Sequence, residues 1–585
     1  MSETIIGIDL GTTNSEVAIV EQGKVKIIER NGQKILPSFV GIDEDDKVIV
    51  GDTARNQYLL YPERTVKSIK RQMGQATQVN LAGKSYAPQE ISAIILKSLK
   101  QTAEQYLGRP VSKAVITVPA YFSDVQRQAT REAGEIAGLE VVRMINEPTA
   151  AALSYGAAHD QPKKMLVYDL GGGTFDVSVV NVESGVVEVL SSHGDNHLGG
   201  DDFDQQIINF LLDHIKNTYQ IDASANIKAM ARISRAAEEA KKALSDQPFV
   251  QIEEEYLLQH QGSPIHLSVE LSRDEYEQMI EEYIYATLDA VHIALRGAKI
   301  ASSGIDEIIL VGGSTRTPCI RERLFNEFGF EPHTEIDPDL CVAMGAAIQA
   351  AMIAGEKVNT VLVDVTPYTY GTSALGVLNG ESYPFTFVPI IHKNSTLPIR
   401  KTEAFTTSYD GQEFVDINIY QGEDSDALNN TKIGEFQVTG LKDTKAGNVI
   451  TLTLELDLNG VLHVSAQEKQ TGLEKSITIK DALTRYQGEM LEKARQRVTS
   501  MFGQMDSTLF DQDNPELEQT DTPEINSARK LLSKAEKLLG QVSSEDKDDI
   551  NGLVKTINKL IKSGDLEGLD EVTTQLSDII YYLES

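Results

Sequence analysis

The sequence lacks several features that would place it in common functional classes. Cysteine occurs only twice in 585 residues, so no disulfide framework follows and we expect a reducing, cytoplasmic compartment. Acidic residues outnumber basic ones: 87 Asp and Glu against 54 Lys and Arg give a net charge of -33. This balance argues against nucleic acid as a partner, since Lys and Arg contacts to phosphate supply most of that affinity. No apolar run approaches the ~20 residues that span a bilayer. The Met-Ser-Glu-Thr start shows no signal-peptide pattern, and we expect no membrane partner.

A short phrase occurs twice in the N-terminal half. Residues 5–13 and 165–174 each combine an apolar run, Asp-Leu-Gly and small residues that end in Thr. An alternating strand follows each copy, at residues 16–20 and 175–180, and then a Gly turn. Such turns expose backbone N–H groups that can bind an anion, and a carboxylate beside a phosphate requires a cation between them. The repeat therefore predicts two β-hairpins that face each other and hold a metal–nucleoside polyphosphate between two lobes.

The two copies supply the first candidate site residues. Asp9 and Asp169 are the predicted metal-site carboxylates, because Mg²⁺ prefers oxygen ligands and keeps waters through which carboxylates can act. Thr12, Thr13 and Thr174 offer hydroxyl and backbone donors to phosphate oxygens. A single Asp-Gly pair would be an ordinary turn, but two copies in matched contexts favour a site.

Two further glycine elements support a nucleotide site. Residues 312–316, Gly-Gly-Ser-Thr-Arg, follow an apolar strand and precede a helix, which suits a ligand at a helix N-terminus. The other is Gly199-Gly200-Asp201. Gly83-Lys84-Ser85 is dismissed as a P-loop, because Gln78 stands where that motif needs Gly. No kinase-type His-Arg-Asp or Asp-Phe-Gly is present. His193 and His197 lie in what we expect to be a turn, with a structural role.

The remaining pattern divides the chain into four segments. Residues 1–355 mix short strands with amphipathic helices, and residues 356–365 form a connector with three apolar residues in a row. The connector is either a buried edge strand or a segment that docks in one state and is released in another. Residues 366–480 alternate with period two, up to a hairpin turn at Asn459-Gly460, and predict a β-sandwich. Residues 481–585 are helical.

Within the last segment, residues 485–502 predict one amphipathic helix and residues 503–522 a polar, acidic loop. Three further helices follow. The first has Thr522 as N-cap and Pro523 at its first position, and the second carries a Ser543-x-x-Asp546 capping signature. Their apolar stripes predict a small helical bundle.

Five motifs, in order and at matching spacing, resemble the heat-shock protein 70 (DnaK) chaperone family. They are Asp9-Leu-Gly-Thr-Thr-Asn-Ser, Val118-Pro-Ala-Tyr-Phe, Ile145-Asn-Glu-Pro-Thr-Ala-Ala-Ala, Asp169-Leu-Gly-Gly-Gly-Thr-Phe-Asp and Val311-Gly-Gly-Ser-Thr-Arg. The resemblance implies a multidomain chain with a two-lobed, actin-like α/β ATPase domain, a β-sandwich peptide-binding domain and a C-terminal helical lid. The lid is shortened, since residues 503–522 interrupt it.

The resemblance also implies the site residues of an ATPase with ATP or ADP, Mg²⁺ and K⁺ as cofactors. Lys70, Glu147, Asp169 and Thr174 match catalytic positions, and Asp9, Asp169 and Asp176 match the metal site. This set is coherent, because phosphoryl transfer needs positioning and charge neutralisation more than covalent chemistry. The nucleotide would contact Gly11, Thr12, Thr13, Gly171, Gly172, Gly173, Gly199, Gly200, Glu238, Lys241, Ser245, Gly312, Gly313, Ser314, Arg316 and Asp339.

The family couples ATP to the binding of extended apolar segments of unfolded proteins, a reciprocal coupling between two sites. Pro119 and Arg127 match its relay to the linker, Leu362 and Asp364 its linker residues, and Arg143 and Asn146 its contacts to a J-domain co-chaperone. A GrpE-type nucleotide exchange factor is a further implied partner. The peptide pocket would comprise Thr372, Leu375, Phe405, Ser408, Val415, Ile417, Ile450 and Leu452.

Departures from the family pattern concern the linker, the pocket and the lid. The linker has Val-Leu-Val where three leucines are usual, so docking buries fewer methylenes, at ~0.8 kcal/mol each. Thr372, Leu375 and Ser408 stand where the family usually has an aliphatic residue, Met and Ala, so peptide preference should differ. The segment between Lys70 and Pro88 is also short. These features indicate a bacterial, cytoplasmic, short-lid paralogue that exchanges peptide fast even with ADP.

Four alternative functions are compared with this interpretation by their sequence requirements. A specialised regulatory chaperone with a narrow client range is compatible with the altered pocket. A small-metabolite kinase of the actin-like fold would need neither a β-sandwich nor an apolar linker. A binding module with an inactive ATPase site conflicts with the presence of Lys70, Glu147, Asp169 and Thr174. A filament-forming actin relative leaves the C-terminal segments without a role.

Overall fold

A computed structural model describes residues 4–156, 162–333, 336–356, 360–441, 445–458, 460–478, 486 and 488–502, together with 553–554, 556–557, 572–573 and 575–576. The chain forms two compact units, residues 1–506 and 507–585. The predicted boundaries at 355, 365 and 480 all fall inside the first unit and stay predictions.

The first sheet defines lobe I and contains the first copy of the repeated phrase. Strands β1 (Ile5–Leu10) and β2 (Asn14–Glu21) form an antiparallel hairpin in the order β11-β10-β1-β2-β3. The other members are β3 (Lys24–Ile27), β10 (Lys113–Val118) and β11 (Glu140–Asn146), and the short β4 (Leu36–Pro37) pairs with β2 beside them. Strands β10 and β11 run parallel. Helices α2 (Pro88–Leu107) and α3 (Asp124–Ile136) share a buried apolar core with this sheet.

The second sheet defines lobe II and repeats the arrangement. Strands β12 (Lys163–Leu170) and β13 (Phe175–Glu183) form the second antiparallel hairpin, in the order β17-β12-β13-β14-β18. The other members are β14 (Val186–Asp195), β17 (Glu307–Val311) and β18 (Val361–Val363). The two predicted hairpins are therefore confirmed. The connector is the edge strand β18, which pairs in parallel with β14 through Val186 and Val361.

Two helices link the sheets through a shared core. Helix α4 (Glu147–Gly156) packs against α10 (Cys341–Ile353), and α10 also packs on β1 and β2. Glycine permits this close approach, because a Cβ at Gly345 would lie 1.7 Å from the Ala150 carbonyl oxygen. A Cβ at Gly7 would lie 2.2 Å from the Ala347 nitrogen. The backbone of α10 therefore lies in direct contact with the backbones of α4 and β1.

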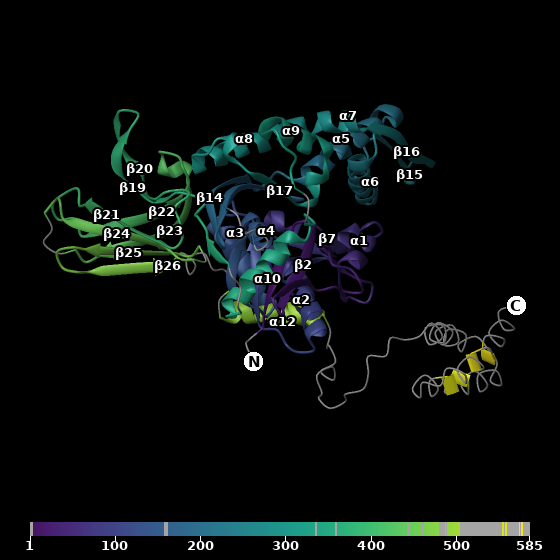
Figure 1. Ribbon diagram of the computed structural model, residues 1–585, viewed down its shortest axis with the longest axis horizontal. Helices are drawn as coiled ribbons and strands as arrows, with labels where there is room; N and C mark the ends of the chain where they lie inside the picture. Colours follow the sequence, from purple (N-terminus) through teal and green to yellow (C-terminus); the bar gives the residue numbers. More distant parts are fainter. Residues whose placement is uncertain are drawn as a thin grey trace. The chain divides into compact units, whose positions relative to one another are not determined.

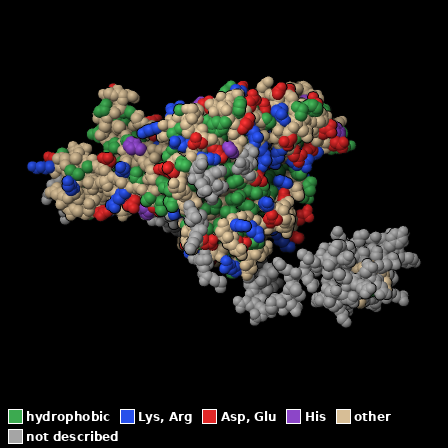
Figure 2. Space-filling view, in the orientation of Figure 1, with side chains coloured by type: hydrophobic (Ala, Val, Ile, Leu, Met, Phe, Trp, Pro, Cys, Tyr) green, Lys and Arg blue, Asp and Glu red, His purple; other side chains and the backbone are tan. Residues whose placement is uncertain are grey.

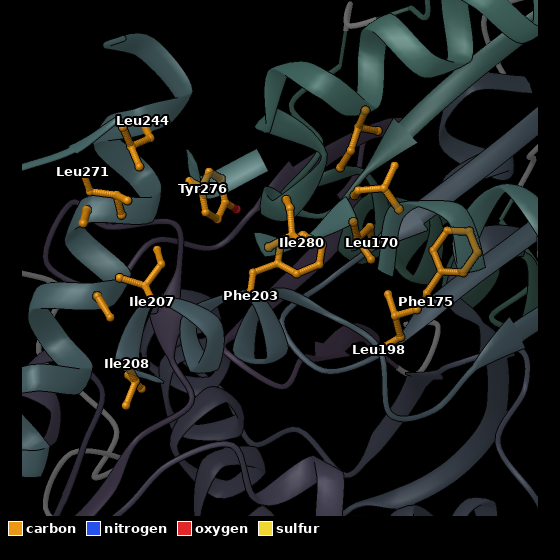
Figure 3. Packing of buried hydrophobic residues seen from close by; sticks show 14 of the residues in the cluster. Leu170, Phe175, Leu198, Phe203, Ile207, Ile208, Leu244, Leu271, Tyr276 and Ile280 are labelled. Carbon is orange, nitrogen blue, oxygen red and sulfur yellow. The ribbon is translucent and has the colours of Figure 1, made fainter. Parts of the chain in front are cut away.

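Lobe II carries a large helical extension with its own apolar core. Figure 3 shows Leu170 and Phe175 of the sheet beside Phe203, Ile207 and Tyr276 of the helices, all buried. The extension comprises α5 (Gly200–Tyr219), α6 (Ile227–Asp246), β15 (Phe249–His260), β16 (Ser263–Ser272), α7 (Arg273–Met279), α8 (Glu281–Ala298), η3 (Ser302–Gly304), η4 (Gly313–Arg316) and α9 (Pro318–Phe328).

Lobe I carries smaller additions. They are β4 (Leu36–Pro37), β5 (Val40–Ile42), β6 (Val48–Val50), α1 (Asp52–Tyr58), η1 (Pro62–Arg64), β7 (Thr65–Val66), η2 (Ile69–Gln72), β8 (Val79–Leu81) and β9 (Lys84–Tyr86). Gly83 lies in the β8–β9 hairpin turn with φ +79°, so its resemblance to a P-loop is accidental.

Residues 366–478 form a β-sandwich, which we call the β-domain, as the alternating pattern predicts. One sheet has the order β20-β19-β22-β23 and the other β21-β24-β25-β26. The inner faces share a core that includes Ile419, Leu452 and Val464. The elements are β19 (Tyr370–Leu378), β20 (Glu381–Ile391), β21 (Ile399–Thr406), β22 (Phe414–Gln421), η5 (Ala427–Asn429), β23 (Thr431–Thr439), β24 (Val449–Leu456), β25 (Leu462–Glu468) and β26 (Glu474–Thr478).

The helix predicted over 485–502 is α12 (Glu489–Met501), which packs on α2 and α3 (Figure 1). Its Ala494 and Val498 are buried in the lobe I core. Arg497 stacks 3.8 Å above the Tyr86 ring centroid and forms an ion pair with Glu90 at 3.2 Å. The predicted loop 503–522 lies outside the described residues. The structure describes only a few residues of the predicted bundle. Among them, Ile557 and Leu576 are helical and their side chains are buried.

The turn predicted around His193 and His197 is wrong for His193 and right for His197. His193 lies in β14, since that strand continues through Gly194, which pairs with Asp176, whereas His197 lies in the turn that follows the strand. Acidic side chains are spread over the face seen in Figure 2 rather than gathered in one patch. None of the described helices is both long enough and apolar enough to cross a membrane.

Candidate functional site

A cavity of about 790 Å³ opens between the lobes, and most of the predicted nucleotide-site residues line it. Gly173, Gly199, Gly200 and Asp176 are not among the lining residues but adjoin them: Gly173 lies against Thr12, Gly199 and Gly200 lie against Gly172, and Asp176 pairs with Asp169. The lining includes Asp9, Gly11, Thr12, Thr13, Lys70, Glu147, Asp169, Gly171, Gly172, Thr174, Glu238, Lys241, Ser245, Gly312, Gly313, Ser314, Arg316 and Asp339.

Glycine is required where the loops of the two lobes meet. A Cβ at Gly172 would lie 1.9 Å from Thr13 Oγ1 in the opposite lobe, and one at Gly199 would lie 2.6 Å from the Gly172 carbonyl carbon. Gly312 adopts φ +82° and lies against the Leu170 carbonyl. Backbone N–H groups can therefore approach a ligand closely from both lobes.

The three predicted metal-site carboxylates are buried, and burial raises the pKa of each. Asp9 accepts a hydrogen bond from Thr117 Oγ1 at 2.6 Å, and its pKa is raised despite the nearby Lys70. Burial and the neighbouring carboxylates raise the pKa of Asp169 well above its ordinary value. Asp176 pairs with Asp169 across the β12–β13 hairpin, and burial raises its pKa to about 6.

Crowded carboxylates with raised pKa values provide a donor set that suits a hard cation. Among the described residues, no three His, Cys, Asp or Glu side chains lie close enough to hold a metal directly. Carboxylate oxygens are the donors that Mg²⁺ prefers, and they can act through its bound waters, so the residues fit this ion. The metal assignment of Asp9, Asp169 and Asp176 stays a prediction.

Lys70 and Glu147, which both line the cavity, form a buried ion pair. Lys70 lies in η2, and Glu147 is the first residue of α4. Burial raises the pKa of Glu147 to about 7, against the opposing effect of Lys70. Burial lowers the pKa of Lys70, but Glu147 and Asp9 outweigh it, so the pKa is raised and the ammonium stays charged. The pair places a fixed positive charge and a titratable carboxylate beside the phosphate loops.

Helix α6 and η4 contribute further polar side chains to the lining of the cavity. Lys241 donates to the Gly200 carbonyl at 3.0 Å and forms an ion pair with Asp204 at 2.8 Å. Arg316 forms an ion pair with Asp339 at 2.8 Å and is half exposed. These groups suit the base and ribose of a nucleotide.

Three residues that sequence reasoning missed belong to this site. Arg71, next to Lys70, crosses the cleft to Asp202 Oδ1 at 2.9 Å and to the His197 carbonyl at 3.3 Å. Glu16 lines the cavity, and burial, with Asp9 nearby, raises its pKa well above the ordinary value. Thr117 holds Asp9. The only sequence feature that could have identified Arg71 is its position beside Lys70. No sequence feature identifies Glu16 or Thr117 as site residues.

A continuous chain of hydrogen bonds joins the cavity wall to the connector. The backbone N–H of Ala120 donates to Asp176 at 3.1 Å, and the Ala120 carbonyl accepts from Arg127 at 2.9 Å. Arg127 also donates to Asn146 Oδ1 at 2.6 Å, and Asn146 donates to Asp364 Oδ2 at 3.0 Å. Three of the predicted coupling residues, Arg127, Asn146 and Asp364, thus lie on one path, and Pro119 precedes Ala120 of the same path. Leu362 packs against the shared core.

The β-domain contacts lobe II and the loop after β10. The Tyr368 hydroxyl donates to the Tyr121 carbonyl at 2.5 Å, and the Tyr121 backbone N–H donates to Asp176 at 3.1 Å. Lys393 donates to His193 Nδ1 at 3.1 Å. His193, which was expected to be merely structural, therefore lies at this contact. Arg143 is half-buried, and burial lowers its pKa.

The eight predicted peptide-pocket residues divide into two groups. Ile417, Ile450 and Leu452 are buried in the sandwich core, and Thr372 is buried with its hydroxyl bonded to the Asn418 carbonyl at 2.7 Å. Phe405 and Val415 are half-buried, whereas Leu375 and Ser408 are exposed. Only the second group offers surface to a ligand as the structure stands.

The family model for Hsp70 protein matches residues 5–80 and 75–584 of the chain. Members of this family are ATP-dependent chaperones that bind ATP or ADP with Mg²⁺, unfolded clients, J-domain co-chaperones and exchange factors. The match extends over nearly the entire chain and includes every element of the cleft, the connector and the β-domain. The chain therefore belongs to the Hsp70 family.

Proposed function

We propose that ATP hydrolysis in the cleft controls binding and release of extended apolar segments of unfolded proteins by the β-domain. The observation that carries this proposal is the hydrogen-bond path from Asp176 through Arg127 and Asn146 to Asp364. Asp364 belongs to the connector, which pairs with lobe II through β18. A change at the phosphate end of the cleft can therefore alter the stability of connector docking, which is a coupling between two sites.

In the catalytic part of the proposal, the chain positions the triphosphate and neutralises its charge. The backbone around Thr12, Thr13 and Gly172 holds phosphate oxygens from both lobes. Lys70 supplies a positive charge that is in place before the reaction, and ionised Glu147 orients the attacking water. When bound, Mg²⁺ supplies further charge neutralisation at the phosphates, and Asp9, Asp169 and Asp176 would hold it through water.

In the binding part of the proposal, an extended client adds main-chain hydrogen bonds along β19 and β22. These strands pair only through Tyr370–Thr372 and Ile419–Gln421, although both continue further. Beyond Thr372 no described strand pairs with the β22-facing side of β19, and such an edge accepts an added strand. Leu375, Ser408, Phe405 and Val415 are the predicted pocket residues with accessible surface, and they would contact the apolar side chains of the client.

The finer assignments belong to the same proposal. Arg143 and Asn146 would contact a J-domain co-chaperone, and a GrpE-type factor would release ADP. K⁺ would accompany Mg²⁺ in the cleft, and the protein would act in a bacterial cytoplasm with a shortened lid that permits fast peptide exchange. The altered pocket residue Thr372, with its hydroxyl bonded to the backbone, favours a narrower client range than an aliphatic residue would.

The test is steady-state ATP hydrolysis with and without an unfolded apolar peptide, in the wild type and in Asp364→Ala. We expect slow hydrolysis that the peptide stimulates, and loss of stimulation in Asp364→Ala because Asn146 loses its acceptor. Glu356→Ala removes an exposed acid close by in sequence and should keep the stimulation. Hydrolysis that no peptide alters, or stimulation that survives in Asp364→Ala, would contradict the coupling.

A further inference from the structure

The hairpin of β19 and β20 projects from the rest of the β-domain (Figure 1). Strand β19 leaves its partner β22 after Thr372, and from Ser373 to Leu378 its described strand partner is β20 alone. The strands shift register between Ala374 and Gly376, so that Leu375 bulges from the ladder. We call residues 375–385 the hairpin tip. Its first residue, Leu375, also belongs to the predicted peptide pocket, and the other residues of the tip lie outside that pocket.

The hairpin tip is anchored at its outer side. The Tyr383 hydroxyl donates to Asp426 Oδ2 at 3.1 Å, and Thr386 bridges to Asp426 through the backbone. Phe387 is buried with Tyr420 and Ala427. The tip is therefore held in place by side chains from the segment after β22. Its position relative to the open edge of β19 is thus defined by specific contacts.

Anchoring does not bury the apolar side chains of the tip. Val377 is 68% exposed, Leu375 64% and Phe385 38%, and hydrophobic side chains are visible on the projecting hairpin in Figure 2. The Phe385 ring lies 5.9 Å from the Tyr383 ring, in an edge-on arrangement that fixes its direction. An ordered, exposed apolar cluster of this kind indicates an interaction surface.

We propose that the hairpin tip is a second apolar contact for the same client that the β19 edge binds. This inference rests on the proposed function. The open edge of β19 runs from Thr372 directly into Val377, so the two surfaces are continuous. At about 3.3 Å per residue, the five-residue step from Thr372 to Val377 corresponds to roughly 16 Å, or about five further residues of an extended client.

Two observations favour a client over a second copy of the chain. The net charge of -33 makes two copies repel each other. The outer edge of the hairpin is also unsuited to strand pairing between copies, because Pro384 and Pro389 lack an N–H and Asp426 bridges to Thr386. An apolar, uncharged client segment meets neither obstacle.

The test compares a short apolar peptide with the same peptide extended by about five apolar residues, at either end, using fluorescence anisotropy on the full chain. We expect the extended peptide to bind the wild type about tenfold more tightly than the short one. The Val377→Ser/Phe385→Ser variant should bind the extended peptide only as tightly as the short one. Its affinity for the short peptide should be unchanged, which also shows that the β-domain remains folded.

Three controls make the result specific. Val377→Leu/Phe385→Leu keeps apolar surface and should retain the gain from extension. Leu60→Ser removes a side chain of similar exposure, 63%, from lobe I and should have no effect. A Gly-Ser extension of equal length should give no gain.

The possible failures are distinguishable. A wild type that binds neither peptide overturns the proposed function and this inference together. If the wild type binds both peptides equally tightly, or if the serine variant loses affinity for both equally, only the proposed client contact of the hairpin tip is overturned. Sedimentation velocity tests whether a second copy of the chain binds the hairpin tip instead. A wild type whose mass exceeds that of the monomer, and a serine variant whose mass falls toward it, would identify the tip as a self-association surface and overturn the proposal.

Discussion

The cleft and the candidate peptide site of the β-domain differ in how their predicted residues are distributed. In the cleft, Asp9, Lys70, Glu147 and Asp169 converge on one cavity, although they come from both lobes. In the β-domain the predicted residues separate, so that Leu452 is fully buried while Leu375 is 64% exposed.

The difference follows from the chemistry that each site requires. A charged side chain such as Lys70 is rarely buried without a partner, so a buried charge marks a site. Glycine at a close approach, such as Gly172, is equally restrictive, because any Cβ there would collide with Thr13. An apolar residue at Leu452 or Leu375 satisfies a core or a surface pocket alike. Residue type therefore separates site from scaffold in the cleft but not in the β-domain.

The largest expected effect tests the cleft. Lys70→Ala should reduce ATP hydrolysis by at least about 100-fold, since removal of one preorganised charge at a reacting group commonly costs that much. ATP binding should persist, because many other residues line the cavity. Steady-state hydrolysis and nucleotide titration measure the two quantities. Lys67→Ala removes another lysine of the same cavity that lacks the Glu147 partner, and an equal loss there would contradict the assignment.

The next effect separates core from surface within the β-domain. Leu452→Ala should lower the free energy of unfolding by about 3 kcal/mol, because it leaves a cavity in a packed core. Leu375→Ala should leave stability almost unchanged and weaken peptide binding. Urea unfolding and peptide anisotropy on both variants decide the matter. The distinction fails if Leu375→Ala destabilises the protein as much as Leu452→Ala does.

An intermediate effect concerns the contact between lobe I and the β-domain. Asp124 is buried near Tyr370 of the β-domain, and burial raises its pKa to about 6 from 3.8. Between those values the folded state binds more protons than the unfolded state, so Asp124 makes stability fall as pH rises. The fall should total on the order of 2–3 kcal/mol, at about 1.4 kcal/mol per pKa unit.

Replacement of Asp124 by Asn should remove that component of the pH dependence. Urea midpoints between about pH 4 and pH 7 measure it, with the wild type losing stability relative to Asp124→Asn as pH rises through the window. Asp45→Asn changes a carboxylate that is 79% exposed and should leave the wild-type profile intact. If the urea midpoint of Asp124→Asn changed with pH in the same way as that of the wild type, the prediction would be wrong.

The smallest expected effect lies where β19 and β22 separate. Thr372→Val removes the hydroxyl that donates to the Asn418 carbonyl, and should cost about 1 kcal/mol. Amide hydrogen exchange in β22 should become faster, while exchange in the lobe I sheet stays as before. Thr406→Val, at an exposed position of β21, is the matched control. Unchanged exchange in β22 would mean that this bond does not hold the strands together.

Much of the fold could be predicted from local patterns. The repeated Asp-Leu-Gly phrase predicted the hairpins β1–β2 and β12–β13, and period-two alternation predicted the sandwich. Strand length was harder to predict, since His193 stays in β14 only because Gly194 pairs with Asp176. The interlobe contact of Arg71 with Asp202 joins residues far apart in the sequence, and no local pattern contains that information.

The sequence by itself determined the two hairpins, most of the residues that line the cleft and the order of the segments, because each depends on residue types at short spacing. Tertiary structure alone decided that the connector docks as β18, that Asp176 is joined to Asp364 through Arg127, and that the hairpin tip stays exposed. These features depend on which distant surfaces meet. Burial and hydrogen bonding between distant segments are properties of the packed chain, and an apolar or polar residue type is compatible with several such arrangements.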